Sequence, residues 1–250
     1  MASPFLRHLF HRMFAIADSN ILSAFLRCAD VVLQDGVRKS DMSEVQDLMC
    51  KIALTDSDIT SFQGFVKEVQ DLPELHRGSK KAQIAYERVV GNITKPSYIG
   101  RLRQYPFVRS GSNDWSSIDQ FKIIADQFED APQLSNLGMI VFHPLDISDA
   151  FRPGYVPCLS FVDIKFRGSR LSCKFYFRSC EFCEVAIFDF YHCINIQNII
   201  ASEFKKRRPD IAIIDREILF NFSRAFTYNR RRGGIFAIRS AADARRLHLS

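Results

Sequence analysis

The stretch "VPCLSFVDIKFRGSRLSCKFYFRSCEF", residues 156–182, decides the fold of this chain. Its second half alternates strictly, because small or apolar side chains occupy four successive odd positions: Leu171, Cys173, Phe175 and Phe177. A period of two is typical of a β-strand that buries one face. The run "RGSR" separates this segment from the similar run before it, where a break in the alternation near Val162 indicates a bulge. The pattern therefore predicts a β-hairpin.

The hairpin places two chemically informative residues across from each other. Cys158 begins the first strand and Arg178 ends the second, at nearly equal distances from the turn. Directly opposed residues of an antiparallel pair lie about 5 Å apart. A guanidinium at that distance stabilises a thiolate and holds an anionic group beside it. Cys158 is therefore a candidate nucleophile, and the alternative interpretation is a structural cysteine beside a surface arginine.

The rest of the C-terminal half also reads as strands with one helix. "LGMIVFHPL" (137–145) is a buried apolar run, and "FYHCINIQNIIASEFKKR" (190–207) has the pattern of a mostly apolar helix. "DIAIID" (210–215), after Pro209, predicts a last strand.

The N-terminal third reads as helices. Apolar side chains recur at helical spacing from Phe5 to Ile16 and again in residues 42–54. Thr55 is placed to cap a third helix, and residues 82–92 and 116–133 predict two more. Residues 93–115 are basic, aromatic and irregular, which is typical of a ligand-facing loop. The prediction is a single α+β domain over 1–250, a mixed sheet backed by helices.

Composition limits the class of protein. The chain is 47% hydrophobic and 25% charged, which is typical of a globular domain, and no apolar run reaches the length of a membrane span. Seven cysteines, an odd number scattered through predicted strands and helices, favour free thiols and a reducing compartment, which we expect to be the cytoplasm. The net charge of +6 favours phosphate-bearing partners, either nucleic acid or anionic small molecules.

Three motifs carry a resemblance to a known family. "PC" (157–158), "LSCKFYFRSCE" (171–181) and "FD" (188–189), followed by a helix ending in "IIAS", resemble the thymidylate synthase and pyrimidine (dCMP, CMP) hydroxymethylase superfamily. The spacing is reproduced without a gap up to residue 201, and the likeness is strongest over 157–201. Weaker matches lie upstream in "SYIGRLR", "IDQ" and "LGMIVFHP".

The resemblance implies a fold, a reaction and roles for individual residues. The fold would be a thymidylate-synthase-like mixed sheet that forms a homodimer face to face through its sheets. Cys158 resembles the nucleophile that adds to C6 of a pyrimidine, with methylenetetrahydrofolate as the one-carbon donor. Arg178 and Ser179 resemble the pair that binds the nucleotide phosphate, and Glu181 the acid that serves the ring and folate region. Tyr98 and Arg101, in the weaker match, are further candidates for substrate binding.

Asp189 indicates which base the site would take. It stands where thymidylate synthase has an asparagine that reads the uracil edge, and the cytidylate hydroxymethylases have an aspartate there. An ionised carboxylate only accepts hydrogen bonds, so it suits the amino group of cytosine. The expected activity is therefore a (d)CMP hydroxymethylase.

Several positions depart from the family pattern. The expected arginine pair reads Asn136-Leu137, and the sugar-binding His-x-Tyr falls near 219–221, where Asn221 is the polar candidate. Glu87 is the only candidate for the folate-site acid. Arginines of the basic segment, including Arg109, are possible substitutes for the missing pair.

The alternative hypothesis is a catalytically inactive protein of this fold that acts as a binding or scaffold module. No pair of motifs stands at zinc spacing, so no metal is predicted.

Overall fold

The computed structural model describes residues 13–76, 98–108, 115–133, 137–143, 146 and 157–249. Its centre is one mixed sheet with the strand order β1-β3-β10-β8-β7-β6, in which β2 also pairs with β3 and β9 with β10. The strands of this sheet are β1 Phe14–Asp18, β2 Val37–Lys39, β3 Met42–Leu54, β6 Leu137–Ile140, β7 Leu159–Arg167, β8 Arg170–Phe177, β9 Cys180–Glu181 and β10 Asp215–Tyr228. A separate ribbon joins β4 Tyr105–Val108 to β5 Trp115–Ile118.

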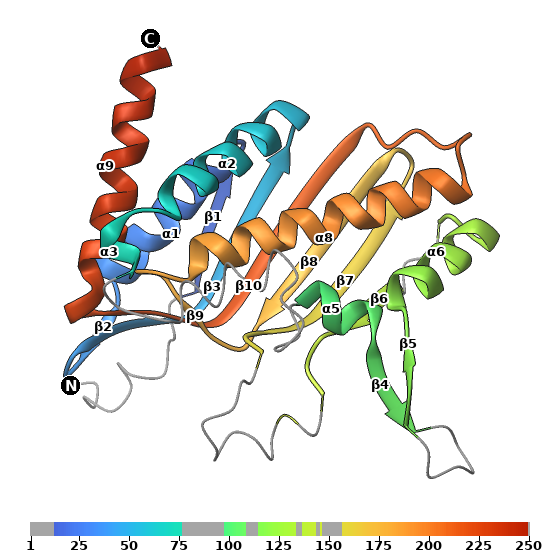
Figure 1. The fold of residues 1–250 in the computed structure, drawn as a ribbon, viewed down its shortest axis with the longest axis horizontal. Helices are drawn as coiled ribbons and strands as arrows, with labels where there is room; N and C mark the ends of the chain where they lie inside the picture. The colour runs from blue at the N-terminus through green and yellow to red at the C-terminus, as the bar shows by residue number, and fades with distance from the viewer. Residues whose placement is uncertain are drawn as a thin grey trace, which may run out of the picture.

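Helices cover one face of the sheet (Figure 1). The described helices are α1 Ile21–Gln34, α2 Asp56–Val69, α3 Pro73–His76, α5 Tyr98–Arg103, α6 Gln120–Asp130, α8 Ala186–Arg207, the short 3-10 helix η2 Asn229–Arg231 and α9 Arg232–Leu249. The longest, α8, crosses the middle of the sheet and packs Phe190 on Phe220 of β10, with ring centroids 4.1 Å apart. The expectation of an α+β fold with a mixed sheet and helices is confirmed.

The predicted hairpin is present. β7 and β8 pair antiparallel from Arg167↔Arg170 to Leu159↔Phe177, and Gly168 takes a positive φ of 62° in the turn. The register shifts between Leu159 and Phe161, so the bulge lies just before the expected position. The odd positions of β8 are buried and the even positions are half-buried or exposed, as the alternation predicts.

The helix expected over 42–54 is wrong, because this segment is the long strand β3. The cause is one residue, Asp47, whose φ of 54° lies in the left-handed region. This conformation shifts the alternation, so that the buried side chains before and after it, Val45 and Leu48, stand three apart in sequence. A spacing of three, followed by Ile52, imitates the stripe of an amphipathic helix.

Four other expectations need correction or lie outside the described residues. Ile16 belongs to strand β1, which runs parallel to β3, and not to a helix; residues 1–12 lie outside the described residues. The last strand begins at Asp215, where the predicted one ended, and runs to Tyr228. The segment 98–108 forms α5 and β4 and is not irregular, whereas the helix predicted over 82–92 lies outside the described residues.

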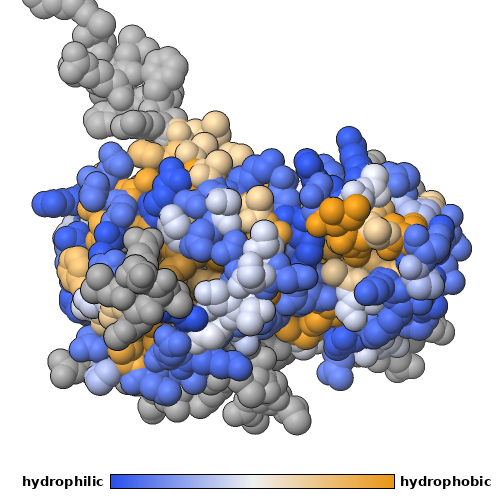
Figure 2. Space-filling view, turned by 90° about the horizontal axis from the view of Figure 1, so that it is seen from above, coloured by the Kyte–Doolittle hydropathy of each residue, from blue (hydrophilic) through white to orange (hydrophobic). Residues whose placement is uncertain are grey.

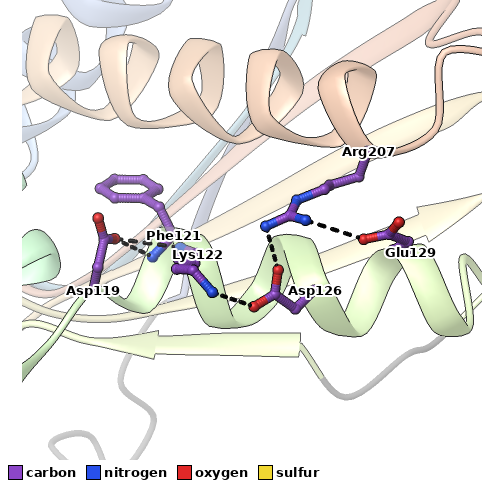
Figure 3. Close-up of polar contacts among 6 residues, drawn as sticks. All are labelled: Asp119, Phe121, Lys122, Asp126, Glu129 and Arg207. Atoms are coloured by element: carbon purple, nitrogen blue, oxygen red, sulfur yellow. Dashed lines mark hydrogen bonds and ion pairs between the residues drawn. The ribbon is translucent and has the colours of Figure 1, made fainter.

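Figure 3 shows how α6 is fixed beneath α8. Asp119 caps α6 by accepting hydrogen bonds from the backbone N–H groups of Phe121 and Lys122, at 3.0 and 3.3 Å. Arg207, at the end of α8, forms ion pairs with Asp126 and Glu129 of α6. The stacked rings of Phe128 and Phe204 lie in the same interface. This contact positions the helix that leads from the β4–β5 ribbon back to the sheet.

The surface seen in Figure 2 is mostly hydrophilic, and its hydrophobic residues form patches separated by hydrophilic ones. Within the described part of the chain, no helix combines the length and the apolar character that crossing a membrane requires.

Candidate functional site

Cys158 lies at the head of β7, beside the end of β8. Its carbonyl oxygen accepts a hydrogen bond of 2.9 Å from the backbone N–H of Arg178, so the expected proximity of these two residues is observed. The Oγ of Ser179 lies 3.9 Å from Sγ of Cys158 and donates to it. Cys158 is half-buried, whereas the other six cysteines are fully buried. It is therefore the thiol that a reagent reaches most easily.

The side chain of Arg178 extends into solvent. Among the described residues, no ion pair to its guanidinium is present. An exposed arginine beside a half-buried thiol leaves its five N–H donors available for an anion such as a phosphate. The hairpin alone determines this arrangement, because residues 158, 178 and 179 all belong to the ends of β7 and β8.

A buried carboxylate lies next to this group. Asp189, only 4% exposed, stands in the first turn of α8. Its Oδ1 accepts a hydrogen bond of 3.0 Å from the hydroxyl of Tyr98, and its Oδ2 accepts one of 3.4 Å from the thiol of Cys180. The Tyr98 hydroxyl also lies 3.5 Å from the backbone N–H of Leu159, the residue after Cys158. Tyr98 thus connects Asp189 to the head of β7.

Burial holds four of the buried thiols in their neutral form. Burial raises the pKa of Cys180 well above its usual value, and the nearby charge of Asp189 raises it further. Burial likewise raises the pKa of Cys28 and of Cys193, and it raises the pKa of Cys173 to about 12. A protonated, inaccessible thiol is a poor nucleophile. These cysteines therefore act as packed core side chains at neutral pH.

The side chain of Glu181 binds backbone N–H groups in this structure. Its carboxylate oxygens accept hydrogen bonds from the N–H groups of Cys183 and Glu184, at 2.8 and 3.0 Å, and so close the turn between β9 and α8. Burial raises the pKa of this carboxyl above its ordinary value. Its predicted catalytic role stays a prediction.

Arg101 also has a partner within the protein. Its guanidinium forms two hydrogen bonds to Asp146, at 2.9 and 3.0 Å, with both side chains mostly buried. Asp146 in turn accepts a hydrogen bond of 2.7 Å from the backbone N–H of His143. This ion pair anchors α5, the helix that begins with Tyr98. Arg101 thus supports the position of Tyr98, and binding substrate would require it to leave Asp146.

The structure does not bring all the predicted residues together. Asn221 lies in the middle of β10 between Met49 and Tyr176, and its neighbours Phe220 and Phe222 are fully buried beneath α8. Because successive side chains point to opposite faces of a strand, Asn221 points away from α8 and from Asp189. Glu87 and Arg109 lie outside the described residues, and so does Asn136.

Cys180 is the member of the group that sequence reasoning missed. The only signal was its position between Ser179 and Glu181, because its contact with Asp189 depends on how α8 packs against β9. Within the described residues, no cluster of three or more histidine, cysteine or acidic side chains is arranged to hold a metal ion.

The site therefore combines an accessible thiol, a hydroxyl donor, an exposed guanidinium and a buried carboxylate. Two comparisons with known proteins found no match: no family model matches the chain, and no curated protein matches it by sequence.

Proposed function

We propose that this protein is a thymidylate-synthase-like enzyme that modifies pyrimidine nucleotides at C5, as a (d)CMP hydroxymethylase, with Cys158 as its nucleophile. The observation that carries the proposal is that the one cysteine that is not fully buried adjoins Arg178 and Ser179. The next residue, Leu159, is linked through the hydroxyl of Tyr98 to Asp189. We further propose a cytoplasmic location, which suits seven free thiols.

The chemistry follows from these side chains. The thiolate of Cys158 adds to C6 of the pyrimidine, and the electron pair of the C5–C6 double bond moves to C5, which becomes nucleophilic. Arg178 and Ser179 hold the phosphate by charge-assisted hydrogen bonds. Asp189 accepts from the amino group of cytosine, because an ionised carboxylate acts only as a hydrogen-bond acceptor.

The proposed carbon donor is methylenetetrahydrofolate, but the described residues do not form a recognisable site for it. Glu181, the acid expected near the donor, has both oxygens bound by backbone N–H groups. The other candidate, Glu87, lies outside the described residues. The chemistry that the described residues support therefore ends at the nucleophilic C5.

A second candidate function is a binding or scaffold module of the same fold. Two observations favour it: Arg101 is bound to Asp146, and Asn221 points away from the group around Cys158. Both were expected to bind substrate.

Selective alkylation tests the role of Cys158. We expect iodoacetamide at neutral pH to label one cysteine, Cys158, because the other six are fully buried. A bound nucleotide covers the thiol, so CMP or dCMP is expected to slow labelling by about 10-fold or more when the site is nearly saturated. Peptide mass spectrometry identifies the labelled residue.

The Cys158→Ser variant is the control for this experiment. It should remain unlabelled when folded and take up six labels in guanidinium. If Cys158 reacts only after unfolding, or if no pyrimidine nucleotide slows its labelling, the proposed function is wrong.

The sheet face away from the helices supports a proposed homodimer. Met49, Asn221, Tyr176, Phe161 and Ile140 lie side by side in register across five strands of this face. Phe161 and Ile140 remain 37% and 47% exposed. A row of this kind, on a face that carries no described helix, suits a second copy packed against it.

Charge placed in this face should separate the two copies. Leu219 lies in register between Lys51 and Lys174, so Leu219→Arg gives three cations in a row that also holds one acid, Asp163. This cationic row would face the same row of the partner. Light scattering is expected to give twice 28.8 kDa for the original protein and 28.8 kDa for the variant. Gln127→Arg, an exposed position on α6 at the helical face, should remain dimeric. A monomeric original protein would contradict the proposal.

A further inference from the structure

A concentration of positive charge lies where β2 and β10 end and β3 begins. Tyr228 and Lys39 both pair with Met42, and the backbone N–H of Asn229 donates to the carbonyl of Asp41 at 2.8 Å. These pairings bring the turn between β2 and β3 next to η2 and the start of α9. We call the six cations of this region the basic strand-end surface: Arg38, Lys39, Arg224, Arg230, Arg231 and Arg232.

The carboxylates that neutralise this surface lie mostly beneath it. Glu44 is 7% exposed and binds two cations, Lys39, which is 56% exposed, and Arg224, which is 40% exposed. Glu184, 2% exposed, pairs with Arg231, and Asp41 pairs with Arg230. The buried Glu181 also interacts with the charge of Arg231, so among the described residues four carboxylates stand against six cations and leave a surplus of two positive charges. Because Glu44 and Glu184 are buried, the outer layer that meets solvent is predominantly cationic.

Two aromatic rings underlie the arginines. Phe226 and Tyr228 pack edge to face, with centroids 5.4 Å apart. The guanidinium of Arg224 lies 4.6 Å from the centre of the Phe226 ring, and those of Arg231 and Arg230 lie 4.9 and 5.5 Å from that of Tyr228. Such stacking fixes the plane of each guanidinium. Glu44 and Glu184 hold one edge of Arg224 and of Arg231, whereas Arg230, 68% exposed, presents most of its N–H groups to solvent. Both rings are half-buried, so part of each remains accessible.

The surface is extended rather than compact. Residues 224–228 alone cover about 13 Å of strand, at about 3.3 Å per residue, and the turn between β2 and β3 lengthens the surface further. A single phosphate would contact only part of it. A chain of phosphates that carries flat, unpaired rings matches both the line of cations and the aromatic side chains among them.

We propose that the basic strand-end surface docks single-stranded nucleic acid, with its arginines on successive phosphates and Phe226 and Tyr228 against unpaired bases. The proposal is independent of the chemistry at Cys158. The two places are nevertheless close, because Phe226 pairs with Glu181 of β9, two residues beyond Ser179.

Matched charge variants test this surface. Binding of a fluorescein-labelled oligothymidylate is followed by fluorescence anisotropy between about 50 and 200 mM salt, the range over which phosphate contacts change affinity most visibly. The triple variant Arg38→Gln, Lys39→Gln, Arg230→Gln should bind about 100-fold more weakly at 0.1 M salt, and the slope of log affinity against log salt should fall by about 2. These three side chains are exposed, so the fold should survive.

The control removes the same charge elsewhere. Lys122→Gln, Lys165→Gln, Arg170→Gln changes three exposed cations on α6, β7 and β8. Arg170 and Lys165 lie level with Asp215 and Glu217, at the end of β10 opposite to Tyr228. It should bind as the original protein does. Tyr228→Leu, which keeps every charge, should weaken single-strand binding by about 10-fold through lost stacking.

Four results would overturn the proposal. They are no binding by the original protein, equal loss in both triple variants, duplex binding as tight as single-strand binding, or binding to phosphatidylserine vesicles with none to the oligonucleotide.

Discussion

Cys158→Ala is expected to abolish the release of tritium from C5 of a labelled cytosine nucleotide. Exchange at C5 needs a carbanion at that carbon, which forms only while a nucleophile is bonded to C6. The carbanion takes a proton from water, and the tritium then leaves C5. Departure of the thiolate from C6 restores the ring. The alanine variant lacks the sulfur, so release should fall to the rate without enzyme. The measurement uses CMP, dCMP, UMP and dUMP labelled at C5.

The donor is left out of half of these reactions. Release without methylenetetrahydrofolate tests the addition of the thiolate to C6 alone. The increase in release on adding methylenetetrahydrofolate tests its proposed role as the carbon donor. Cys183→Ala, which removes a buried sulfur outside the group, is the matched control and should keep activity.

The choice of nucleotide tests Asp189. We expect release from CMP or dCMP, whereas Asp189→Asn should favour UMP or dUMP, since an amide donates to O4 and accepts from N3–H. Release only from uracil by the original protein would contradict the cytosine assignment and keep the nucleophile. No release from any of the four, with no nucleotide binding by calorimetry, would favour the scaffold function.

Phe190→Ala is expected to lower the free energy of unfolding by about 3–5 kcal/mol. Phe190 is fully buried, stacks on Phe220 at 4.1 Å and meets the edge of Phe25 at 5.6 Å. It therefore joins three elements of the core: α8, β10 and α1. Its loss leaves a cavity that surrounding rings fill only in part, and that residual cavity adds to the cost of the lost burial.

Urea denaturation measures this change as a lower midpoint with an unchanged m-value. Phe236→Ala is the matched control, because the side chain of Phe236 on α9 is 55% exposed. Its effect should stay within about 0.5 kcal/mol. A loss below about 1 kcal/mol at Phe190 would mean that α8 does not pack on the sheet as described.

Local patterns predicted those parts of the fold that depend on few residues. The hairpin of β7 and β8 was predictable because the alternation and the turn lie within about twenty residues, and the proximity of Cys158 to Arg178 followed from counting. Strand β3 was not predictable, because Asp47, in the left-handed conformation, changes the phase of the alternation along this strand. No composition rule identifies such a residue in advance, since aspartate adopts this conformation only where the fold requires it.

The partners of the site residues were less predictable than the residues themselves. The hydrogen bond from Tyr98 to Asp189 joins positions 91 residues apart, and the ion pair of Arg101 with Asp146 joins positions 45 apart. Both depend on where α5 packs, which no periodicity within residues 98–103 determines. Residue types indicated which side chains can do chemistry, but the packing of helices decides which of them are free to do it.

The position of β10 has a consequence for how the chain folds. β10 pairs with β3 on one side and with β8 on the other, although it follows both in the sequence. During synthesis, β1 with β3 and β7 with β8 form two half-sheets whose facing edges stay unpaired until residues 215–228 leave the ribosome. Unpaired edges of this kind readily join other chains. We therefore expect the sheet to close when this late strand inserts between two early ones, and the nascent chain to associate readily with its own copies until then.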